Sequence, residues 1–172
     1  MQDSVAITSN LISGQLANGQ TRQLDIISPV DGRLLSKVGL SDSHDLETAV
    51  IAAKKTFPNW SQRTLKQRVQ VFYNFRQLLI DNLDLLGRMI HLENGKTVGE
   101  AKAEVMKGIE LTEFACSLPQ FINDEIQIVS QGIECRTTHV PLGVVASITP
   151  FNFPAMVPLW TCLLYTSDAA DE

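Results

Sequence analysis

The stretch Val144-Val145-Ala146-Ser147-Ile148-Thr149-Pro150-Phe151-Asn152-Phe153-Pro154 decides how this chain is interpreted. Its apolar, β-branched first half predicts a buried strand of a parallel-type sheet, which ends by projecting the amide of Asn152. That amide carries two N–H donors, and the Phe rings on either side would keep water away from them. Such donors suit a negative oxygen that develops only during a reaction, whereas the alternative is that Asn152 simply occupies a turn.

Composition and charge exclude several classes of protein. At 172 residues, with 44% hydrophobic and 19% charged residues, the chain can form one globular domain with its own core. A net charge of −5 with scattered Lys and Arg gives no support to nucleic-acid binding. The first ten residues lack the pattern of a secretory signal, and three cysteines without a C-x-x-C pair argue against a disulfide framework. We therefore expect a cytoplasmic location, or the mitochondrial matrix in a eukaryote.

One apolar run is long enough to resemble a membrane span. No charged residue occurs from Val140 to Ser167. Four prolines lie within this run, and each removes a backbone donor and interrupts a helix. We therefore predict a buried strand, a buried turn and a helix here, with no membrane association.

The remaining pattern predicts a mixed α/β protein. Strands are expected at 24–27 and 34–38, joined by the Ser28–Gly32 turn, and Asn18-Gly19 is a hairpin signal. Period-two alternation predicts two more strands, one around Ile126 and Ile128 and one over 134–139.

Four amphipathic helices are predicted between these groups of strands. The first begins at an N-cap among residues 41–43, buries Leu46, Val50, Ala53 and Phe57, and ends at Pro58. The boundaries of the others are Thr64 as a start, Asn94-Gly95 as an end, and Thr97 with Glu100 as a capping box for a helix closed by Pro119. Helices followed by a parallel-type strand are typical of the beginning of an α/β enzyme.

Several of these motifs resemble the aldehyde dehydrogenase superfamily. The strongest is Pro-Phe-Asn-Phe-Pro at 150–154, reached from Pro141-Leu142-Gly143-Val144. Further marks are Ser28-Pro29 with Gly32, Phe57-Pro58-Asn59-Trp60, Arg68 and Glu93-Asn94-Gly95-Lys96. The resemblance covers about residues 11–160. It implies the N-terminal part of an aldehyde dehydrogenase fold, with leading helices, small strands and the start of a Rossmann-type cofactor domain.

Within the superfamily, the chain is most similar to the CoA-acylating methylmalonate-semialdehyde dehydrogenases. The stretches that carry this similarity are Phe72-Tyr73-Asn74-Phe75, Lys107-Gly108-Ile109-Glu110, Glu113-Phe114-Ala115-Cys116 and Ala155-Met156-Val157-Pro158-Leu159-Trp160. The resemblance implies NAD-dependent oxidation of a small semialdehyde through a Cys thioester. Coenzyme A would then take the acyl group with loss of carbon dioxide, and the full-length enzyme would be a homodimer or homotetramer.

The resemblance also assigns site residues. Asn152 matches the position whose amide holds the developing oxyanion, and its loss would cost about a hundred- to a thousand-fold in rate. Thr149, Pro150 and Phe151 match positions whose backbone lines the cofactor, and Ile148 lies beside them. Lys107 stands where relatives often have Arg, and an exposed helix residue explains it equally well.

No cysteine of the chain is expected to be catalytic. Cys116 and Cys135 are interpreted as packing residues, and the family's nucleophile, general base and phosphate-binding turn lie further downstream. The three histidines show no metal-ligand spacing, so no metal is expected.

The family pattern stops after Thr161. We therefore expect residues 1–161 to be a partial N-terminal and NAD-binding domain, and residues 162–172 to be a non-native tail. Such a chain would be an incomplete and inactive fragment. Two alternatives are a hydrolytic NAD-dependent aldehyde dehydrogenase and a short non-catalytic protein that binds a full-length subunit.

Overall fold

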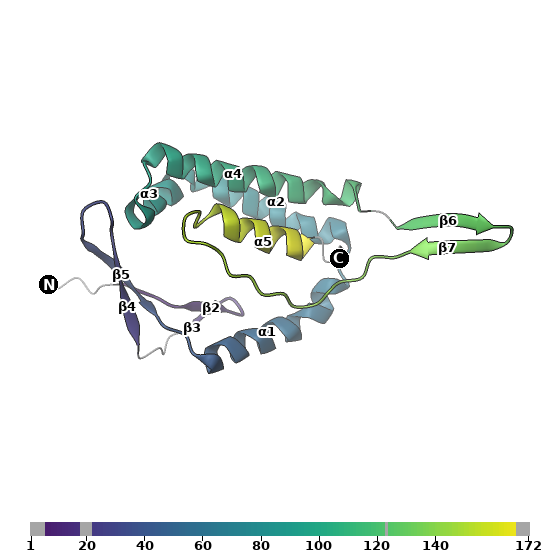
Figure 1. Ribbon diagram of the computed structural model, residues 1–172, viewed down its shortest axis with the longest axis horizontal. Coiled ribbons are helices and arrows are strands. Elements are labelled where there is room, and N and C mark those ends of the chain that lie inside the picture. Colours follow the sequence, from purple (N-terminus) through teal and green to yellow (C-terminus); the bar gives the residue numbers. More distant parts are fainter. Residues whose placement is uncertain (1–5, 18–21, 123, 168–172) are drawn as a thin grey trace.

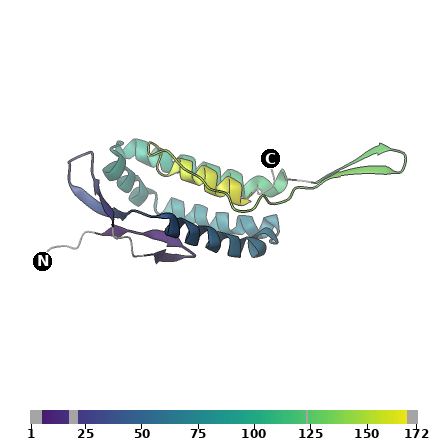
Figure 2. The same cartoon turned by 60° about the horizontal axis from the view of Figure 1, so that its bottom comes forward.

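The computed structural model describes residues 6–17, 22–122 and 124–167. A layer of helices forms its centre, a small sheet lies at one end, and a hairpin extends from the other end (Figures 1 and 2). The helices are α1 (Ser43–Ser61), α2 (Leu65–Asp81), α3 (Leu83–Asn94), α4 (Val98–Ser117) and α5 (Met156–Ser167), with a short 3-10 turn at Leu118–Gln120. These helices and strands confirm the predicted α/β class.

The strands form three separate small sheets. One has three strands in the order β1-β5-β4, with β1 parallel and β4 antiparallel to β5. The other two are antiparallel hairpins, β2–β3 and β6–β7. The strand bounds are β1 (Ile7–Thr8), β2 (Asn10–Ile12), β3 (Gln15–Ala17), β4 (Gln23–Ile27), β5 (Leu34–Gly39), β6 (Glu125–Ser130) and β7 (Ile133–Thr137). These strands confirm the predictions at 24–27, 34–38 and around Ile126, while Asn18-Gly19 lies outside the described residues.

Local sequence signals set the helix boundaries. Asp42, Thr64 and Thr97 are N-caps, and each forms a capping box with the residue three positions later. Helix α3 ends at Gly95, which adopts the left-handed conformation with φ of +84°. These four boundaries confirm the sequence predictions, and they fix how α3 turns into α4.

Helix α4 is the centre of the core, because it packs against α2, α3 and α5. Two groups of buried residues combine side chains of α4 with those of its neighbours. The first consists of Val69, Phe72, Ala115, Cys116, Leu118 and Leu163, and the second of Leu79, Ile90, Ala101, Val105 and Ile109. The long-range packing thus places α5, from the C-terminal part of the chain, against helices that precede it by many residues.

Gly108 permits this close packing of α5 on α4. A Cβ added to Gly108 would lie 2.5 Å from Leu159 Cδ1. We expect Gly108→Val to lower the free energy of unfolding by about 1–3 kcal/mol, because the added methyl groups displace Leu159. Urea denaturation would measure this change. Gly99→Val is the matched control on the same helix, since a Cβ at Gly99 meets nothing within 4 Å. Equal effects of the two substitutions would contradict the packing argument.

The predicted strand at 144–148 is wrong. Residues 138–150 have no regular secondary structure, and Val144 and Val145 are exposed rather than buried. A strand forms only beside a hydrogen-bonded neighbour, and this segment pairs with none of the strands in the described ranges. The apolar, β-branched composition is therefore compatible with a strand but does not by itself create one.

Two predictions about the first helix are also wrong. Pro58 lies inside α1, which continues to Ser61. Because Pro58 is close to the helix end, it removes one hydrogen bond without breaking the last turn. None of the residues of α1 is buried, and Leu46 is 65% exposed. The apolar pattern correctly indicated a helix, but it did not establish that another element covers this face.

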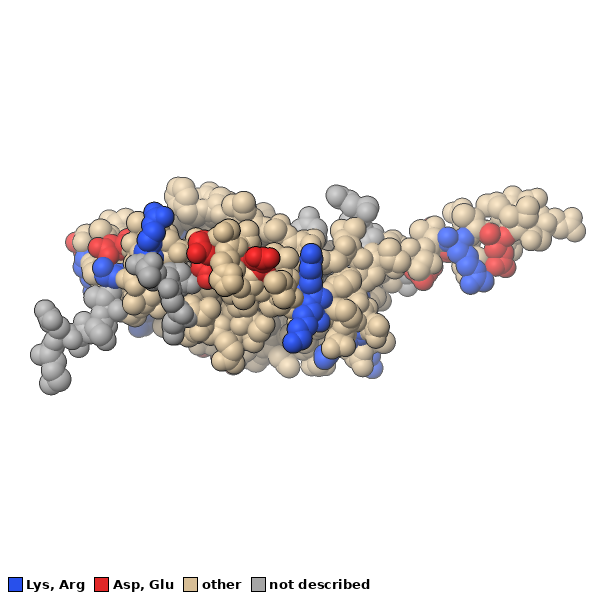
Figure 3. Space-filling model, turned by 90° about the horizontal axis from the view of Figure 1, so that it is seen from below, with Lys and Arg blue, Asp and Glu red and all other residues tan. Residues whose placement is uncertain are grey.

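Charge is distributed without a dominant sign on the face shown in Figure 3. Acidic and basic side chains occur at intervals along it, and on the β6–β7 hairpin Arg136 pairs with Glu134 at 3.3 Å.

The apolar run after Val140 was long enough to resemble a membrane span. In the described part of the chain, however, none of the helices is both long enough and apolar enough to cross a bilayer.

Candidate active site

The residues predicted to carry the chemistry lie in the irregular segment that leads into α5 (Figure 1). Asn152 is exposed, and so are Phe151 (87%) and Ile148 (fully), while Thr149 is half-buried. The turn at 151–155 therefore presents the Asn152 amide at the surface of the described structure. The predicted shielding by two Phe rings is only partial, because Phe153 is 37% exposed and Phe151 projects outward.

The C-terminal end of α3 holds this turn on both sides of Asn152. The Asn94 side chain donates a hydrogen bond from Nδ2 to the backbone oxygen of Phe151 at 3.0 Å. The Lys96 ammonium lies 4.0 Å from the centre of the Phe153 ring, a cation–π contact. Two residues of the Glu93–Lys96 motif thus contact two residues of the Pro150–Pro154 motif, although many residues separate the motifs in sequence.

A buried carboxylate holds the start of α5. Glu104 is 4% exposed, and its Oε1 accepts hydrogen bonds from the backbone N–H groups of Ala155 (2.8 Å) and Met156 (3.1 Å). Its other oxygen, Oε2, forms an ion pair with Lys96. A carboxylate suits this place because the first N–H groups of a helix lack partners within the helix and carry partial positive charge.

The backbone of Lys96 is also fixed. The His91 ring nitrogen Nδ1 lies 2.6 Å from the carbonyl oxygen of Lys96, so α3 contacts the loop at a further point. The left-handed Gly95 makes the sharp turn that brings Lys96 back toward α4, and a Cβ there would lie 3.0 Å from Pro29 Cγ. Local backbone geometry therefore directs the Lys96 side chain between Glu104 and Phe153.

The motif analysis missed Asn94, Lys96 and Glu104 as parts of the site. The first two belong to a stretch that we used only as a family mark and, for Asn94, as part of a helix end. For Glu104 a signal was present in the sequence, since it lies between Ala101 and Val105 on the apolar face of the predicted helix. A carboxylate on a buried face requires partners, and this would have indicated a buried ionic network.

The surroundings of Glu104 control its pKa. Burial alone would raise it, but the hydrogen bonds from Lys96, Ala155 and Met156 outweigh burial and hold the pKa of Glu104 below its ordinary value. A lowered pKa in the folded state means that this carboxylate stabilises the fold above the pKa of an unfolded Glu, about 4.3. This contribution is lost as the pH falls through the lower, folded-state value.

We expect a corresponding pH dependence of stability. The difference in unfolding free energy between the native chain and Glu104→Gln should be largest near pH 7 and should shrink as the pH falls below about 4. Urea denaturation at a series of pH values measures this difference. Using the difference removes the contributions of Asp84 and Glu100, whose pKa values are lowered by exposed partners present in both proteins. A difference that is constant from neutral to acidic pH would contradict the assignment.

The cysteines lie in contrasting environments. Cys116 lies on α4 and is buried in the core with Val69 and Phe72 of α2, and burial raises the pKa of its thiol, which disfavours the reactive thiolate. This confirms its interpretation as a packing residue. Cys135 is exposed on β7, so its interpretation as a packing residue is wrong: the β6–β7 hairpin has no buried residue on either strand.

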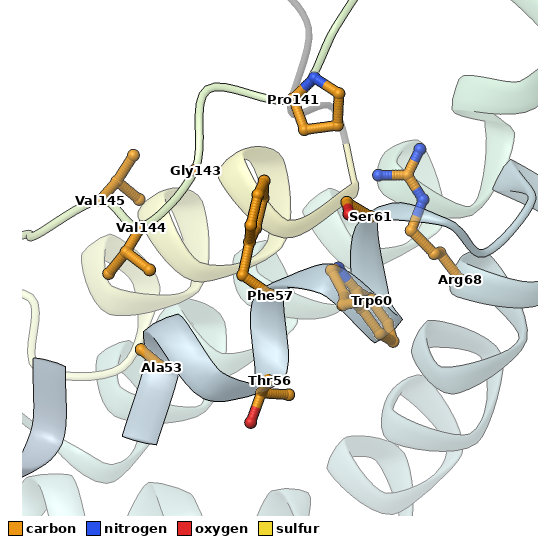
Figure 4. Close-up of a pocket in the computed structure, with 10 residues that line it drawn as sticks. All are labelled: Ala53, Thr56, Phe57, Trp60, Ser61, Arg68, Pro141, Gly143, Val144 and Val145. Atoms are coloured by element: carbon orange, nitrogen blue, oxygen red, sulfur yellow. The ribbon is translucent and has the colours of Figure 1, made fainter. Parts of the chain in front are cut away.

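A separate cleft of about 350 Å³ lies between α1 and the segment that follows His139. In Figure 4, the Phe57 ring and the Arg68 guanidinium extend toward the part of the chain that carries Pro141 and Gly143. The cleft thus gathers several family motifs. Its described lining residues include neither Asn152 nor any residue predicted to line the cofactor.

The arrangement limits how a dinucleotide could bind. The backbone of 148–151 is not part of a sheet and is accessible, so it could form one wall of a cofactor site. The N-terminus of α5 cannot bind a phosphate in this arrangement, because the N–H groups that the phosphate would need already donate to the Glu104 carboxylate. The described residues therefore fit the predicted contacts along 148–151 but do not supply a phosphate cradle at α5.

Across residues 6–17, 22–122 and 124–167, no three His, Cys, Asp or Glu side chains come together as possible metal ligands.

Comparisons with known proteins give a consistent result. A family profile described as "Aldehyde dehydrogenase family" matches residues 16–165. Malonate-semialdehyde dehydrogenase from Pseudomonas aeruginosa is 41% identical over 152 residues, which are 88% of this chain and 31% of the relative. The Bacillus pumilus enzyme of the same name is 38% identical over 158 residues, which are 91% of this chain and 32% of the relative. The chain thus spans about a third of the length of these curated relatives.

Solved structures give the same picture for the fold. The crystal structure of methylmalonate-semialdehyde dehydrogenase from Oceanimonas doudoroffii matches 97% of this chain with a TM-score of 0.92 and 35% identity, over 34% of its own length. A Sinorhizobium meliloti protein assigned to the same enzyme class, crystallised with NAD, matches 98% with a TM-score of 0.92 and 33% identity, over 35% of its own length. The predicted correspondence to the N-terminal part of this fold is confirmed.

Proposed function

Because the chain belongs to the aldehyde dehydrogenase family, we propose that it provides the N-terminal part of an NAD-dependent enzyme that oxidises malonate semialdehyde or methylmalonate semialdehyde. The observation that carries this proposal is the anchored turn that presents Asn152, in a chain 41% identical to a malonate-semialdehyde dehydrogenase. The enzyme names of the relatives support the substrate class.

The proposed reaction converts the aldehyde into an acyl-CoA. A Cys thiolate adds to the aldehyde carbon, and loss of a hydride from that carbon gives a thioester. The coenzyme A thiol then displaces the Cys thiolate, and the substrate carboxylate leaves as carbon dioxide, with a proton taking its place on the carbon. Malonate semialdehyde would give acetyl-CoA, and methylmalonate semialdehyde would give propionyl-CoA. NAD, when bound, supplies the hydride acceptor. In this proposal the full-length enzyme is a homo-oligomer, and coenzyme A is its acyl acceptor.

The residues of this chain contribute binding and electrostatics. Asn152 donates hydrogen bonds from its amide to the aldehyde oxygen as negative charge develops there. Ile148, Thr149, Pro150 and Phe151 form one wall of the cofactor site, and their accessible backbone supports that role. The Asn94 hydrogen bond to the Phe151 carbonyl fixes the position of this wall relative to the turn that carries Asn152.

We expect the isolated 172-residue chain to form no NADH from semialdehyde, NAD and coenzyme A. Burial raises the pKa of the Cys116 thiol, and Cys135 lies on the hairpin that projects from the helices (Figure 1). Neither of these two cysteines is placed to attack an aldehyde held by Asn152, and the third, Cys162, does not match the family's nucleophile, which lies further downstream. Steady NADH formation by the purified chain with either semialdehyde would contradict this expectation.

A chimera tests the proposed function directly. Residues 1–161 would replace the matching N-terminal third of the Pseudomonas aeruginosa malonate-semialdehyde dehydrogenase, and NADH formation from malonate semialdehyde would be followed by absorbance. We expect NADH formation that requires coenzyme A and yields acetyl-CoA. NADH with release of the free acid, and no need for coenzyme A, would indicate the hydrolytic alternative. A folded chimera that oxidises neither semialdehyde would overturn the proposal.

A further inference from the structure

We propose that Lys96 and Glu104 are positioning residues for Asn152, because together they tie the turn at 150–154 to helices α3 and α4. This inference rests on the proposed function for the role of Asn152, while the tie itself is a property of this chain. Glu104 bonds to Lys96 and to the start of α5, and Lys96 also contacts Phe153.

The first link runs from Glu104 into α5. Its Oε1 accepts from the N–H groups of Ala155 and Met156, the residues that directly follow the Pro150–Pro154 motif. These two bonds fix the exit of the turn against α4. Glu104 is buried, so water competes little for either bond.

The second link runs through Lys96 to the centre of the turn. The ammonium group pairs with Glu104 and lies 4.0 Å from the centre of the Phe153 ring. On the other side of Asn152, Asn94 binds the Phe151 carbonyl at 3.0 Å. Both neighbours of Asn152 are thus held by residues 94–96, while the Asn152 side chain itself remains exposed.

The two links make one unit with three points of attachment. Asn94 fixes the residue before Asn152, Lys96 fixes the residue after it, and Glu104 fixes the helix that follows. An amide that stabilises a developing charge must be held within a fraction of an ångström, and a misplacement of about 1 Å can cost a hundred-fold in rate. A turn of exposed residues cannot achieve such precision without anchors of this kind.

An alternative is that the ion pair only stabilises the packing of α4. The two explanations differ in which parts of the backbone become more mobile when the ion pair is lost. Loss of a positioning contact should increase motion at 150–157 selectively, whereas loss of general packing should increase motion across α2, α3 and α4 as well.

Hydrogen exchange on the whole 172-residue chain, read by mass spectrometry at labelling times too short for global unfolding, separates these explanations, because at those times each amide reports on local opening alone. We expect the amides of 151–157 to exchange about five- to tenfold faster in Glu104→Gln and in Lys96→Met, because a charged bond is replaced by a neutral one. The double variant should increase exchange by less than the product of the two single effects, since the two residues share one ion pair. Glu110→Gln, which removes a charge from an exposed pair on the same helix, is the matched control and should match the native chain.

Two results of this exchange experiment would overturn the proposal. One is an unchanged exchange rate at 151–157 in both single variants. The other is an equal increase across α2, α3 and α4, which would assign the pair to general packing.

Kinetics of the chimera provide the second readout. We expect Glu104→Gln to lower kcat about ten- to a hundredfold with little change in KM, and to have no further effect when Asn152 is already Ala. An undiminished effect of Glu104→Gln in the Asn152→Ala background would show that Glu104 acts independently of Asn152, and would overturn the proposal. An inactive native chimera, with exchange as expected, would instead refute the proposed function and leave the anchoring of the turn intact.

Discussion

Replacing Asn152 by alanine in the chimera is expected to lower kcat by about a hundred- to a thousand-fold, because the side-chain amide donates to the oxyanion only as charge develops. The KM for the semialdehyde should change much less, since the ground-state aldehyde gains little from this donor. Steady-state NADH formation measures both constants. Asn74→Ala is the matched control, because Asn74 is an exposed asparagine on α2, and its kcat should equal that of the native chimera.

An acidic variant sharpens this test. Asn152→Asp keeps the size of the side chain but replaces the donating N–H group by a carboxylate oxygen, which would repel a developing oxyanion. We expect it to be at least as slow as Asn152→Ala. If either variant retains the native kcat, Asn152 is not the oxyanion donor, and its place in the turn is only structural.

Removing Lys96 should have the largest effect on stability. In Lys96→Met, the Glu104 carboxylate stays buried and loses its cation, so we expect the free energy of unfolding to fall by about 3 kcal/mol. This is the lower end of the range for buried pairs, because a fifth of the Lys96 side chain (20%) remains exposed. Urea denaturation of the 172-residue chain at neutral pH would measure the change.

The control for this prediction is another lysine in an ion pair. Lys107 pairs with Glu110 at 2.7 Å, but its side chain is 63% exposed. Lys107→Met should therefore cost at most about 1 kcal/mol, as expected for surface pairs. If the two lysine variants lose the same stability, the Lys96–Glu104 pair behaves as a surface pair, and burial of Glu104 contributes nothing to it.

Much of the fold could be predicted from local sequence. Helix starts were expected at an N-cap among residues 41–43, at Thr64 and at Thr97, and the structure has N-caps at Asp42, Thr64 and Thr97, each with a capping box. Gly95 was expected to end α3, and it does so with φ of +84°. These features depend on groups within a few residues of one another, so the sequence alone contains their causes.

Burial was predicted less well. The apolar pattern of α1 correctly indicated a helix, but none of the residues on its apolar face is fully buried, and the run at 144–148 is exposed and irregular. In both cases the pattern describes a surface that can be buried. Whether it is buried depends on partners elsewhere in the fold. The predicted boundary of a non-native tail at residue 162 stays a prediction, and Leu163 packs in the core beside Val69 and Phe72.

The sequence by itself determined where α1, α2 and α4 begin, where α3 ends, and the family motifs that led to the prediction of Asn152, because each depends on residue type and short spacing. Only the tertiary structure decided that Asn94 and Lys96 hold the two neighbours of Asn152 and that Glu104 holds the start of α5. The physical reason is that these contacts join segments that are far apart in the sequence. The hydrogen bond between Asn94 and Phe151 spans 57 residues, and the one between Glu104 and Ala155 spans 51. Such contacts exist only once α3, α4 and α5 have packed around a common core.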